Sequence, residues 1–229
     1  MIYEVYTPPP NERPEVEIIL FHGLQLADYN DAHVTTWLSR DNSCLWVQTW
    51  LVELFPKARI LTIAYDSSAK RTQEYGMLDM YRTGENLVSS LVADGVEVGQ
   101  RKCPVILVGH CLGGLVLKET CLSAAWMLGR KSATMHGVNR IENLLDNLGG
   151  MFFYGTPHNG LLLDNNMDNF KGALVEELKI LNASNARRNQ EFDDLKTKYK
   201  WVTFGIGEAC ETYVVSILSV LFPFPMGFF

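Results

Sequence analysis

The sequence predicts a single α/β domain that spans residues 1–229 and is built on a mostly parallel sheet. Two observations predict this fold class. Short apolar runs without alternation recur along the chain, as expected for strands covered on both faces. Stretches with helical apolar spacing lie between those runs, which indicates βαβ units. A chain of this length is also long enough to bury a sizeable core.

Five apolar runs are the predicted strands. Most end at a glycine or at small polar residues, where a strand gives way to a turn. The strand runs are Glu17–Phe21, Arg59–Tyr65, Val105–Val108, Gly150–Tyr154 and Trp201–Phe204.

Five further stretches have apolar residues at helical spacing. The third is largely apolar, as suits a buried helix, and the last two are more amphipathic. The predicted helices are 46–54, 77–91, 115–128, 170–181 and 189–199, and the first would place Trp46, Trp50, Leu51 and Leu54 on one face.

Composition excludes several classes of function. The net charge is −6 and no basic stripe occurs, so a nucleic-acid partner is not expected. Five scattered cysteines without a Cys-x-x-Cys pair fit neither a disulfide framework nor a zinc site, which favours a reducing compartment. The residues imply no metal and no cofactor. The N-terminus lacks the pattern of a signal or transit peptide.

The segment 213–229 carries no charge and contains two prolines. It is short for a membrane span, and no other stretch is long and apolar enough for one. The preferred interpretation is a strand followed by an apolar tail. Peripheral membrane contact is the alternative.

Gly109-His110-Cys111-Leu112-Gly113 is the most informative stretch of the chain. It follows a buried-strand pattern and precedes an apolar helix, as does the nucleophile elbow, in which a reactive side chain sits on a tight strand-to-helix turn. The central residue is Cys111 rather than the usual serine. At the N-terminus of a helix, the dipole would stabilise its thiolate. The alternative is a structural cysteine beside a glycine-rich turn.

Two backbone N–H groups are the expected oxyanion donors. In this architecture one belongs to the residue after the nucleophile, here Leu112, and the other to the loop after an earlier strand. Phe21-His22-Gly23-Leu24 fits that loop, and the N–H of Leu24 is the candidate. His22 is interpreted as a structural histidine that holds the loop.

These residues, with several other stretches, resemble an α/β-hydrolase family, the serine-active-site-containing lipase-like serine esterases, and in particular its plant members. The resemblance implies an α/β-hydrolase fold and an esterase- or lipase-type hydrolase acting on an acyl-ester or lipid substrate. It also implies association with mitochondrial and endoplasmic reticulum membranes, with a cytosolic location as the alternative. The matching stretches are Phe21–Leu24, Thr36–Leu38, Trp46 with Thr49–Leu51, Ala58–Leu61, Tyr65–Ser68, Gly109–Leu115, Tyr154–Gly160 and Gly207–Thr212.

The chain departs from that family in two ways. Cys111 replaces the family's elbow serine, and the C-terminal segment that supplies a histidine is missing, so the C-terminal edge of the sheet is expected to be incomplete. The acid candidates are Glu211 first and Glu208 second. His158 is the one histidine weighed as a base, although it precedes the acid, and a structural role is preferred for it. His33 and His136 fall in expected loops and receive no role.

Three functional hypotheses follow. The first is a carboxylic-ester hydrolase of lipid type with Cys111 as nucleophile, since a few per cent of a free thiol is already ionised near neutral pH. The second is a catalytically inactive relative that keeps the scaffold for binding at membranes. The third is an incomplete or alternatively spliced product that folds poorly.

Overall fold

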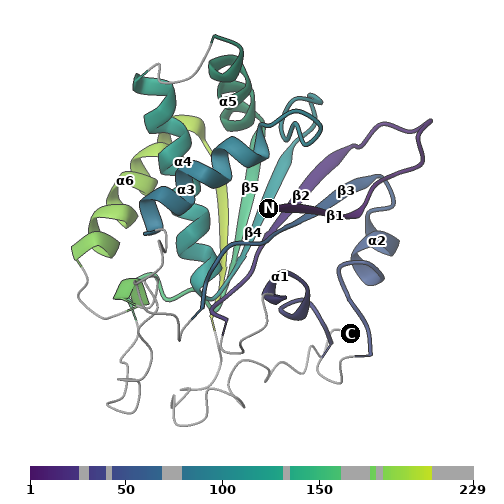
Figure 1. Cartoon of the computed structure of the whole chain (residues 1–229), viewed down its shortest axis with the longest axis horizontal. Coiled ribbons are helices and arrows are strands. Elements are labelled where there is room, and N and C mark those ends of the chain that lie inside the picture. Colours follow the sequence, from purple (N-terminus) through teal and green to yellow (C-terminus); the bar gives the residue numbers. More distant parts are fainter. Residues whose placement is uncertain are drawn as a thin grey trace.

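A six-stranded sheet forms the centre of the computed structural model, which describes residues 1–25, 31–39, 43–68, 79–130, 135–160, 176–178 and 183–207 (Figure 1). The strand order is β1-β3-β2-β4-β5-β6, with β1 antiparallel to β3 and all other neighbours parallel. The strands are β1 Ile2–Tyr6, β2 Val16–Phe21, β3 Ala58–Ile63, β4 Val105–His110, β5 Leu148–Tyr154 and β6 Val202–Ile206.

Helices cover the two faces of the sheet unequally. Four long helices gather over one face in Figure 1, while α1 and α2 flank the other face beside β2 and β3. Asp79 caps the first long helix, because its carboxylate accepts the N–H of Arg82 at 2.8 Å. The helices are α1 Ala32–Thr35, α2 Trp50–Leu54, α3 Met80–Leu91, α4 Leu112–Arg130, α5 Met135–Asn147 and α6 Ala183–Tyr199, with a 3₁₀ turn at Glu176–Leu178.

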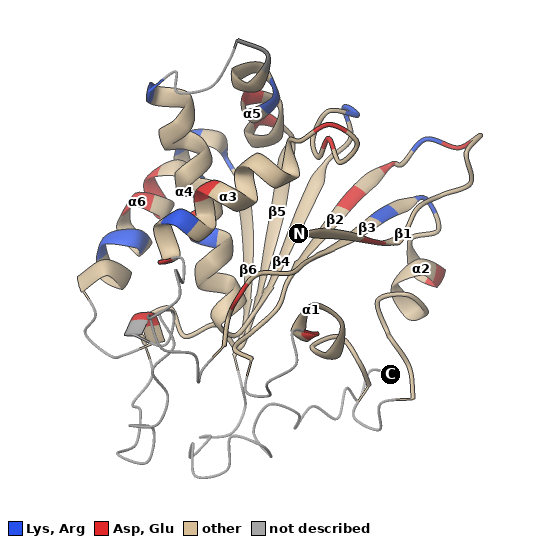
Figure 2. Cartoon of the chain, viewed as in Figure 1, with Lys and Arg blue, Asp and Glu red and all other residues tan. Residues whose placement is uncertain are grey.

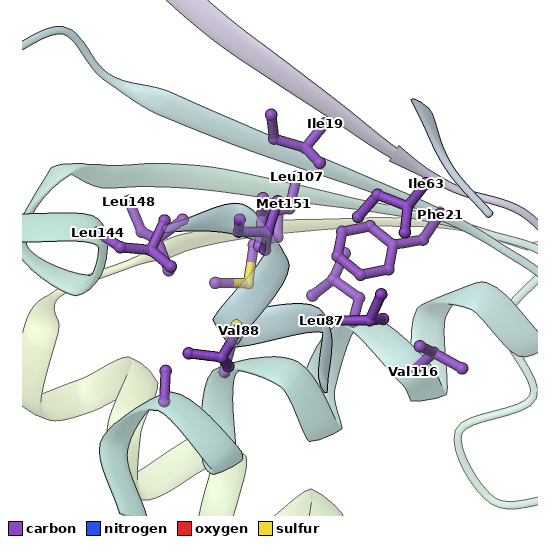
Figure 3. Packing of buried hydrophobic residues seen from close by; sticks show 14 of the residues in the cluster. Ile19, Phe21, Ile63, Leu87, Val88, Leu107, Val116, Leu144, Leu148 and Met151 are labelled. Atoms are coloured by element: carbon purple, nitrogen blue, oxygen red, sulfur yellow. The ribbon is translucent and has the colours of Figure 1, made fainter. Parts of the chain in front are cut away.

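The larger apolar core lies between the four long helices and the sheet (Figure 3). Ile19 and Phe21 of β2 alternate into this core, and Leu107 and Met151 of the neighbouring strands join them. Side chains that alternate to the opposite face, such as Leu20, enter a smaller cluster with residues of the α1 and α2 region. Two buried faces explain why the central strands read as continuous apolar runs.

The predicted parallel sheet is confirmed, with strand ends shifted by a few residues. One part of the prediction is wrong, because β6 is not covered on both faces among the described residues. Val202 and Phe204 remain 52% and 51% exposed. Phe204 instead stacks on Phe152 of β5, with ring centroids 5.0 Å apart. An edge strand can be apolar without being buried, so the run 201–204 alone could not distinguish the two cases.

Several elements differ from the predictions for local reasons. The predicted helix 46–54 forms only over Trp50–Leu54, as α2. Its Trp50 and Leu54 face outward rather than into the core. The strand β1 and the helix α5 are not among the predicted elements. His33 and His136 lie in α1 and α5 rather than in loops. Of the predicted helix 170–181, only 176–178 lies within the described residues.

Charged side chains lie mainly on the helices and at the ends of β2 and β3 remote from the elbow (Figure 2). One of them, Glu17 on β2, is fully buried. Its carboxylate accepts N–H groups from Arg59 and Arg101, each at 2.9 Å, and from the backbone of Gly99 at 2.7 Å. These donors compensate the buried charge, so removing the carboxylate would leave Arg59 without its closest counter-charge.

A second polar cluster joins α4 to α6. Arg188 of α6 donates to Glu119 of α4 at 2.8 Å and to Glu177 at 3.1 Å, and it also contacts Asn185. Lys118, one residue before Glu119, donates to Asn189 at 2.7 Å. Burial lowers the pKa of Lys118 to about 8. These hydrogen-bonded charges add to the apolar contacts that Phe192 of α6 makes in the larger core.

Within the described part of the chain, we find no helix with the length and apolar content needed to cross a membrane.

Replacing the buried carboxylate of Glu17 tests this arrangement. We expect Glu17→Gln to lower the free energy of unfolding by about 3 kcal/mol, since breaking a buried, hydrogen-bonded ion pair leaves an uncompensated charge. Glu15→Gln is the matched control. Glu15 pairs with Lys57 at 2.7 Å, but both side chains are more than half exposed, so a loss below about 1 kcal/mol is expected. Urea unfolding of both variants measures the difference, and equal losses would contradict the assignment.

Candidate active site

The turn between β4 and α4 has the strained backbone of an elbow. Cys111 has a φ of +50°, in the left-handed region that residues with a Cβ rarely adopt. Its N–H donates to the carbonyl of Tyr154 at the end of β5 at 2.8 Å, and its own carbonyl accepts the N–H of Gly114 at 3.1 Å. The predicted strand–turn–helix geometry at Cys111 is confirmed.

Close contacts explain two glycines, one at this turn and one in the loop after β2. A Cβ on Gly113 would fall 2.7 Å from the carbonyl carbon of Phe21, so only glycine lets α4 begin against the end of β2. A Cβ on Gly23 would lie 3.1 Å from the Cβ of Cys111 and 2.9 Å from Nδ1 of His110. The loop after β2 therefore packs directly on the elbow.

The Cys111 thiol lies at the N-terminus of a 19-residue helix. Its side chain is partly buried, packs against the larger core and is not in a disulfide. The phenol of Tyr65 is close enough to interact with it: burial, and then the charge on Cys111, raise the pKa of Tyr65 well above its ordinary value.

The loop after β2 is fastened to the loop after β3. The hydroxyl of Tyr65 donates to the carbonyl of His22, and the N–H of Gln25 donates to the carbonyl of Ser67 at 3.0 Å. The hydroxyl of Ser67 donates to the carbonyl of Gly23 at 2.9 Å. Because β2 and β3 are neighbours in the sheet, their following loops meet at the same edge.

The structural interpretation of His22 is confirmed. Its ring is buried, stacks on Tyr65 with centroids 4.0 Å apart, and places Nδ1 2.9 Å from the carbonyl of Gly23. A carbonyl only accepts, so Nδ1 carries the proton and Nε2 accepts the N–H of Tyr65 at 3.4 Å. Burial lowers the pKa of His22 to about 4, which keeps the imidazole neutral.

His110 precedes the elbow cysteine and faces the smaller apolar cluster. Its ring meets Trp37 edge to face, with centroids 6.4 Å apart. Nδ1 is enclosed and has no hydrogen-bond partner among the described residues. Burial lowers the pKa of His110 to about 4.

His158 follows β5 and is held between α4 and α6. Its ring meets Phe153 edge to face at 5.0 Å, and its carbonyl accepts the side-chain N–H of Asn189 at 2.7 Å. Burial, and then the nearby Lys118 ammonium, lower the pKa of His158 to about 4. Lys118 is two helical turns beyond Cys111. These contacts favour the structural role for His158, and its role as a base stays a prediction.

The predicted site residues divide into two groups. Leu24 and Leu112 flank Cys111 from the two expected directions: Leu24 follows the glycine that touches the elbow, and Leu112 is the first residue of α4. Glu208, Glu211 and the apolar tail 213–229 lie outside the described residues. The described part of the chain contains no cluster of three or more His, Cys, Asp or Glu side chains that could hold a metal ion.

Sequence reasoning assigns no role to Ser67, Tyr65 or Tyr154, although all three hold the loops around Cys111. The sequence feature that could have indicated their role was their position relative to a predicted strand. Tyr65 ends a predicted strand and Ser67 follows it closely, and residues at that place in a parallel sheet gather with those that follow its neighbours.

The parallel sheet, the elbow and the adjacent loop together define an α/β-hydrolase fold, and solved structures agree. The chain superposes on the mature lipase BlEst2 of Bacillus licheniformis with a TM-score of 0.56 at 17% identity, covering 96% of this chain and 76% of the lipase. It superposes on the phospholipase PlaB of Legionella pneumophila with a TM-score of 0.54 at 11% identity, covering 83% of this chain and 37% of that protein.

Among curated proteins, the chain is similar to Protein SERAC1. It is 25% identical to the Danio rerio protein over 231 aligned positions, which cover 92% of this chain and 33% of the relative. Identity to the Bos taurus protein is 28% over 180 positions, covering 72% of this chain and 25% of the relative. The aligned region thus spans about a third or less of these relatives. No family model matches the sequence.

The buried histidines predict how stability depends on pH. His22 and His110 stay neutral in the folded protein down to about pH 4, whereas an unfolded histidine takes up a proton near pH 6.5. Stability is therefore complete above pH 6.5 and falls as the pH drops toward 4, by roughly 2 kcal/mol per group at pH 5. Urea unfolding at pH 7 and pH 5 measures this loss. His110→Gln should reduce the difference by about 2 kcal/mol, the share of one group, and a wild-type stability that is equal at both values would contradict the assignment.

Proposed function

We propose that this chain is a carboxylic-ester hydrolase whose nucleophile is the thiol of Cys111. The observation that carries the proposal is the left-handed turn at Cys111, which holds the side chain at the start of α4 with the loop of Gly23 packed against it. Such strain is a common feature of functional sites. The likeness to lipases and esterases concerns the fold and is consistent with this chemistry.

The proposed reaction has two stages. The Cys111 thiolate attacks the acyl carbonyl carbon, and the carbonyl electron pair moves to the oxygen, where the N–H groups of Leu24 and Leu112 would stabilise the negative charge. Collapse of this intermediate breaks the bond to the alcohol oxygen, which takes a proton from water, and leaves a thioester. The hydroxide left by that water adds to the thioester, the thiolate departs, and the carboxylic acid is released.

Proton transfer would involve carboxylates and one imidazole. Glu211, and after it Glu208, are the proposed acids, and His158 is the one base candidate. A thiol depends less on a base than a serine hydroxyl does, because part of it is ionised near neutral pH. This difference is the physical reason for a cysteine at an elbow without a strong base.

The proposed substrate is an acyl ester of lipid type. Its support is the family resemblance of the elbow and loop motifs together with the fold shared with a lipase and a phospholipase. Peripheral contact with mitochondrial or endoplasmic reticulum membranes is part of the same proposal and rests on the resemblance alone.

A second candidate is a catalytically inactive α/β-hydrolase fold that binds partners at membranes. The pKa values of the histidines favour it. Burial lowers the pKa of His22, His110 and His158 to about 4, and imidazoles that bind protons so weakly are poor general bases near neutral pH.

Substitution of Cys111 separates the two candidates. If the chain is a thiol esterase, it should hydrolyse p-nitrophenyl butyrate above background, and Cys111→Ala should abolish the excess. Cys111→Ser should fall at least about tenfold below wild type, because its hydroxyl is not ionised without a base. Initial rates at pH 7.5, followed at 405 nm, give the comparison.

Cys44→Ala is the matched control, since Cys44 is also a partly buried, unbridged cysteine but lies before β3, away from the elbow. It should keep the wild-type rate. A wild-type protein no more active than Cys111→Ala would reject the thiol-esterase proposal in favour of the inactive scaffold.

A further inference from the structure

We infer that Ser67, together with His22, is a positioning residue that fixes the direction of the Leu24 N–H. This inference deepens the proposed function, because Leu24 is a proposed oxyanion donor there. We call the contacts of Ser67 and His22 with the carbonyl of Gly23 the clamp, and these contacts do not depend on activity.

The clamp acts on one carbonyl. Gly23 presents its carbonyl oxygen to two donors, the Ser67 hydroxyl at 2.9 Å and Nδ1–H of His22 at 2.9 Å. The two donors also lie 3.4 Å from each other. Two hydrogen bonds on one oxygen restrict both the position of that oxygen and the rotation of its peptide group.

The carbonyl of Gly23 and the N–H of Leu24 belong to the same peptide unit. That unit is planar and trans, since the described chain contains no cis peptide bond. The N–H therefore points in the direction opposite to the carbonyl. When Ser67 and His22 hold the carbonyl on their side, the Leu24 N–H must point away from them.

The donors are themselves held in place. Ser67 and His22 are each 1% exposed. The backbone carbonyl of Ser67 accepts the N–H of Gln25, and the Tyr65 hydroxyl binds the carbonyl of His22. Each peptide from His22 to Gln25 is thus tied to the loop after β3. A group held this firmly reorganises little when charge develops beside it, which is what an oxyanion donor requires.

The opposite side of this loop is occupied by the elbow. Gly23 packs so tightly there that a Cβ would come within 3.1 Å of the Cβ of Cys111. A clamp on one side and the nucleophile on the other leave the Leu24 N–H directed into the space beside Cys111. The hydroxyl of Ser67, which contacts no reacting atom, sets that direction.

The direction of an N–H bond can be measured by NMR as a residual dipolar coupling. Labelling glycine carbonyls with ¹³C and leucine nitrogens with ¹⁵N selects only Gly–Leu pairs, which occur three times, at 23–24, 114–115 and 160–161. We expect Ser67→Ala to change the coupling of Leu24 and to speed its amide hydrogen exchange at least about tenfold. Leu115, inside α4, is the internal reference and should not change.

Ser123→Ala is the matched control, because Ser123 is also a serine 1% exposed and its hydroxyl has no hydrogen-bond partner among the described residues. It should leave Leu24 as in the wild type. If Ser67→Ala leaves the coupling and exchange of Leu24 unchanged while the protein stays folded, the clamp is refuted. If Ser67→Ala does not fold, Ser67→Cys provides the test: it keeps a side chain of similar size but donates only weakly to the Gly23 carbonyl, and an unchanged Leu24 coupling refutes the clamp.

An activity measurement then links the clamp to catalysis. Sulfur accepts N–H hydrogen bonds weakly, so an oxyanion hole favours an ester over the corresponding thionoester. The ratio of kcat/KM for this pair should fall about tenfold in Ser67→Ala and stay constant in Ser123→Ala. A changed Leu24 coupling with an unchanged ratio would support the clamp and reject Leu24 as the donor. A changed coupling in a protein without esterase activity would support the clamp and reject the proposed function.

Discussion

The left-handed backbone at Cys111 is the constraint on which the rest of the site depends. A residue with a Cβ in this conformation costs roughly 1–3 kcal/mol, so the surrounding structure must hold it there. The hydrogen bond from its N–H to Tyr154 fixes the turn against β5, and the carbonyl of Cys111 begins the first turn of α4. Around it the backbone is packed so closely that glycine is required where α4 meets the end of β2. This packing of the backbone positions the thiol at the start of α4.

The order of the strands in the sheet brings other loops to this strained turn. β4 lies in the middle of the sheet with β2 on one side and β5 on the other, so the loops that follow all three strands meet around Cys111. The loop after β3 lies one strand further along and reaches the site only by fastening the loop after β2. Residues distant in the sequence, such as Ser67 and Gly23, are thereby held in contact by the order of the strands.

The sequence was most informative where one residue type is physically required. The elbow could be predicted because the turn demands small residues around a nucleophile, and the strands β2 to β5 because burial on both faces demands continuous apolar runs. Prediction failed where an element is short or lies at an edge. The strand β1 alternates weakly, α2 keeps only one turn, and β6 is apolar although exposed. Ser67 could not be assigned, since its role depends on a carbonyl in another loop and leaves no pattern in the sequence.

The attachment of α6 has a consequence for how the molecule responds to heat. Arg188 ties this helix to α4 through Glu119 and to the nearby 3₁₀ turn through Glu177, and Phe192 adds apolar packing in the larger core. The cost of removing charged groups from water declines with rising temperature, while the gain from burying apolar surface levels off. Warming therefore weakens the ion pairs of Arg188 less than their electrostatic character at room temperature would suggest. On heating, the attachment of α6 to α4, the helix that follows Cys111, should therefore depend more on Arg188 and less on Phe192.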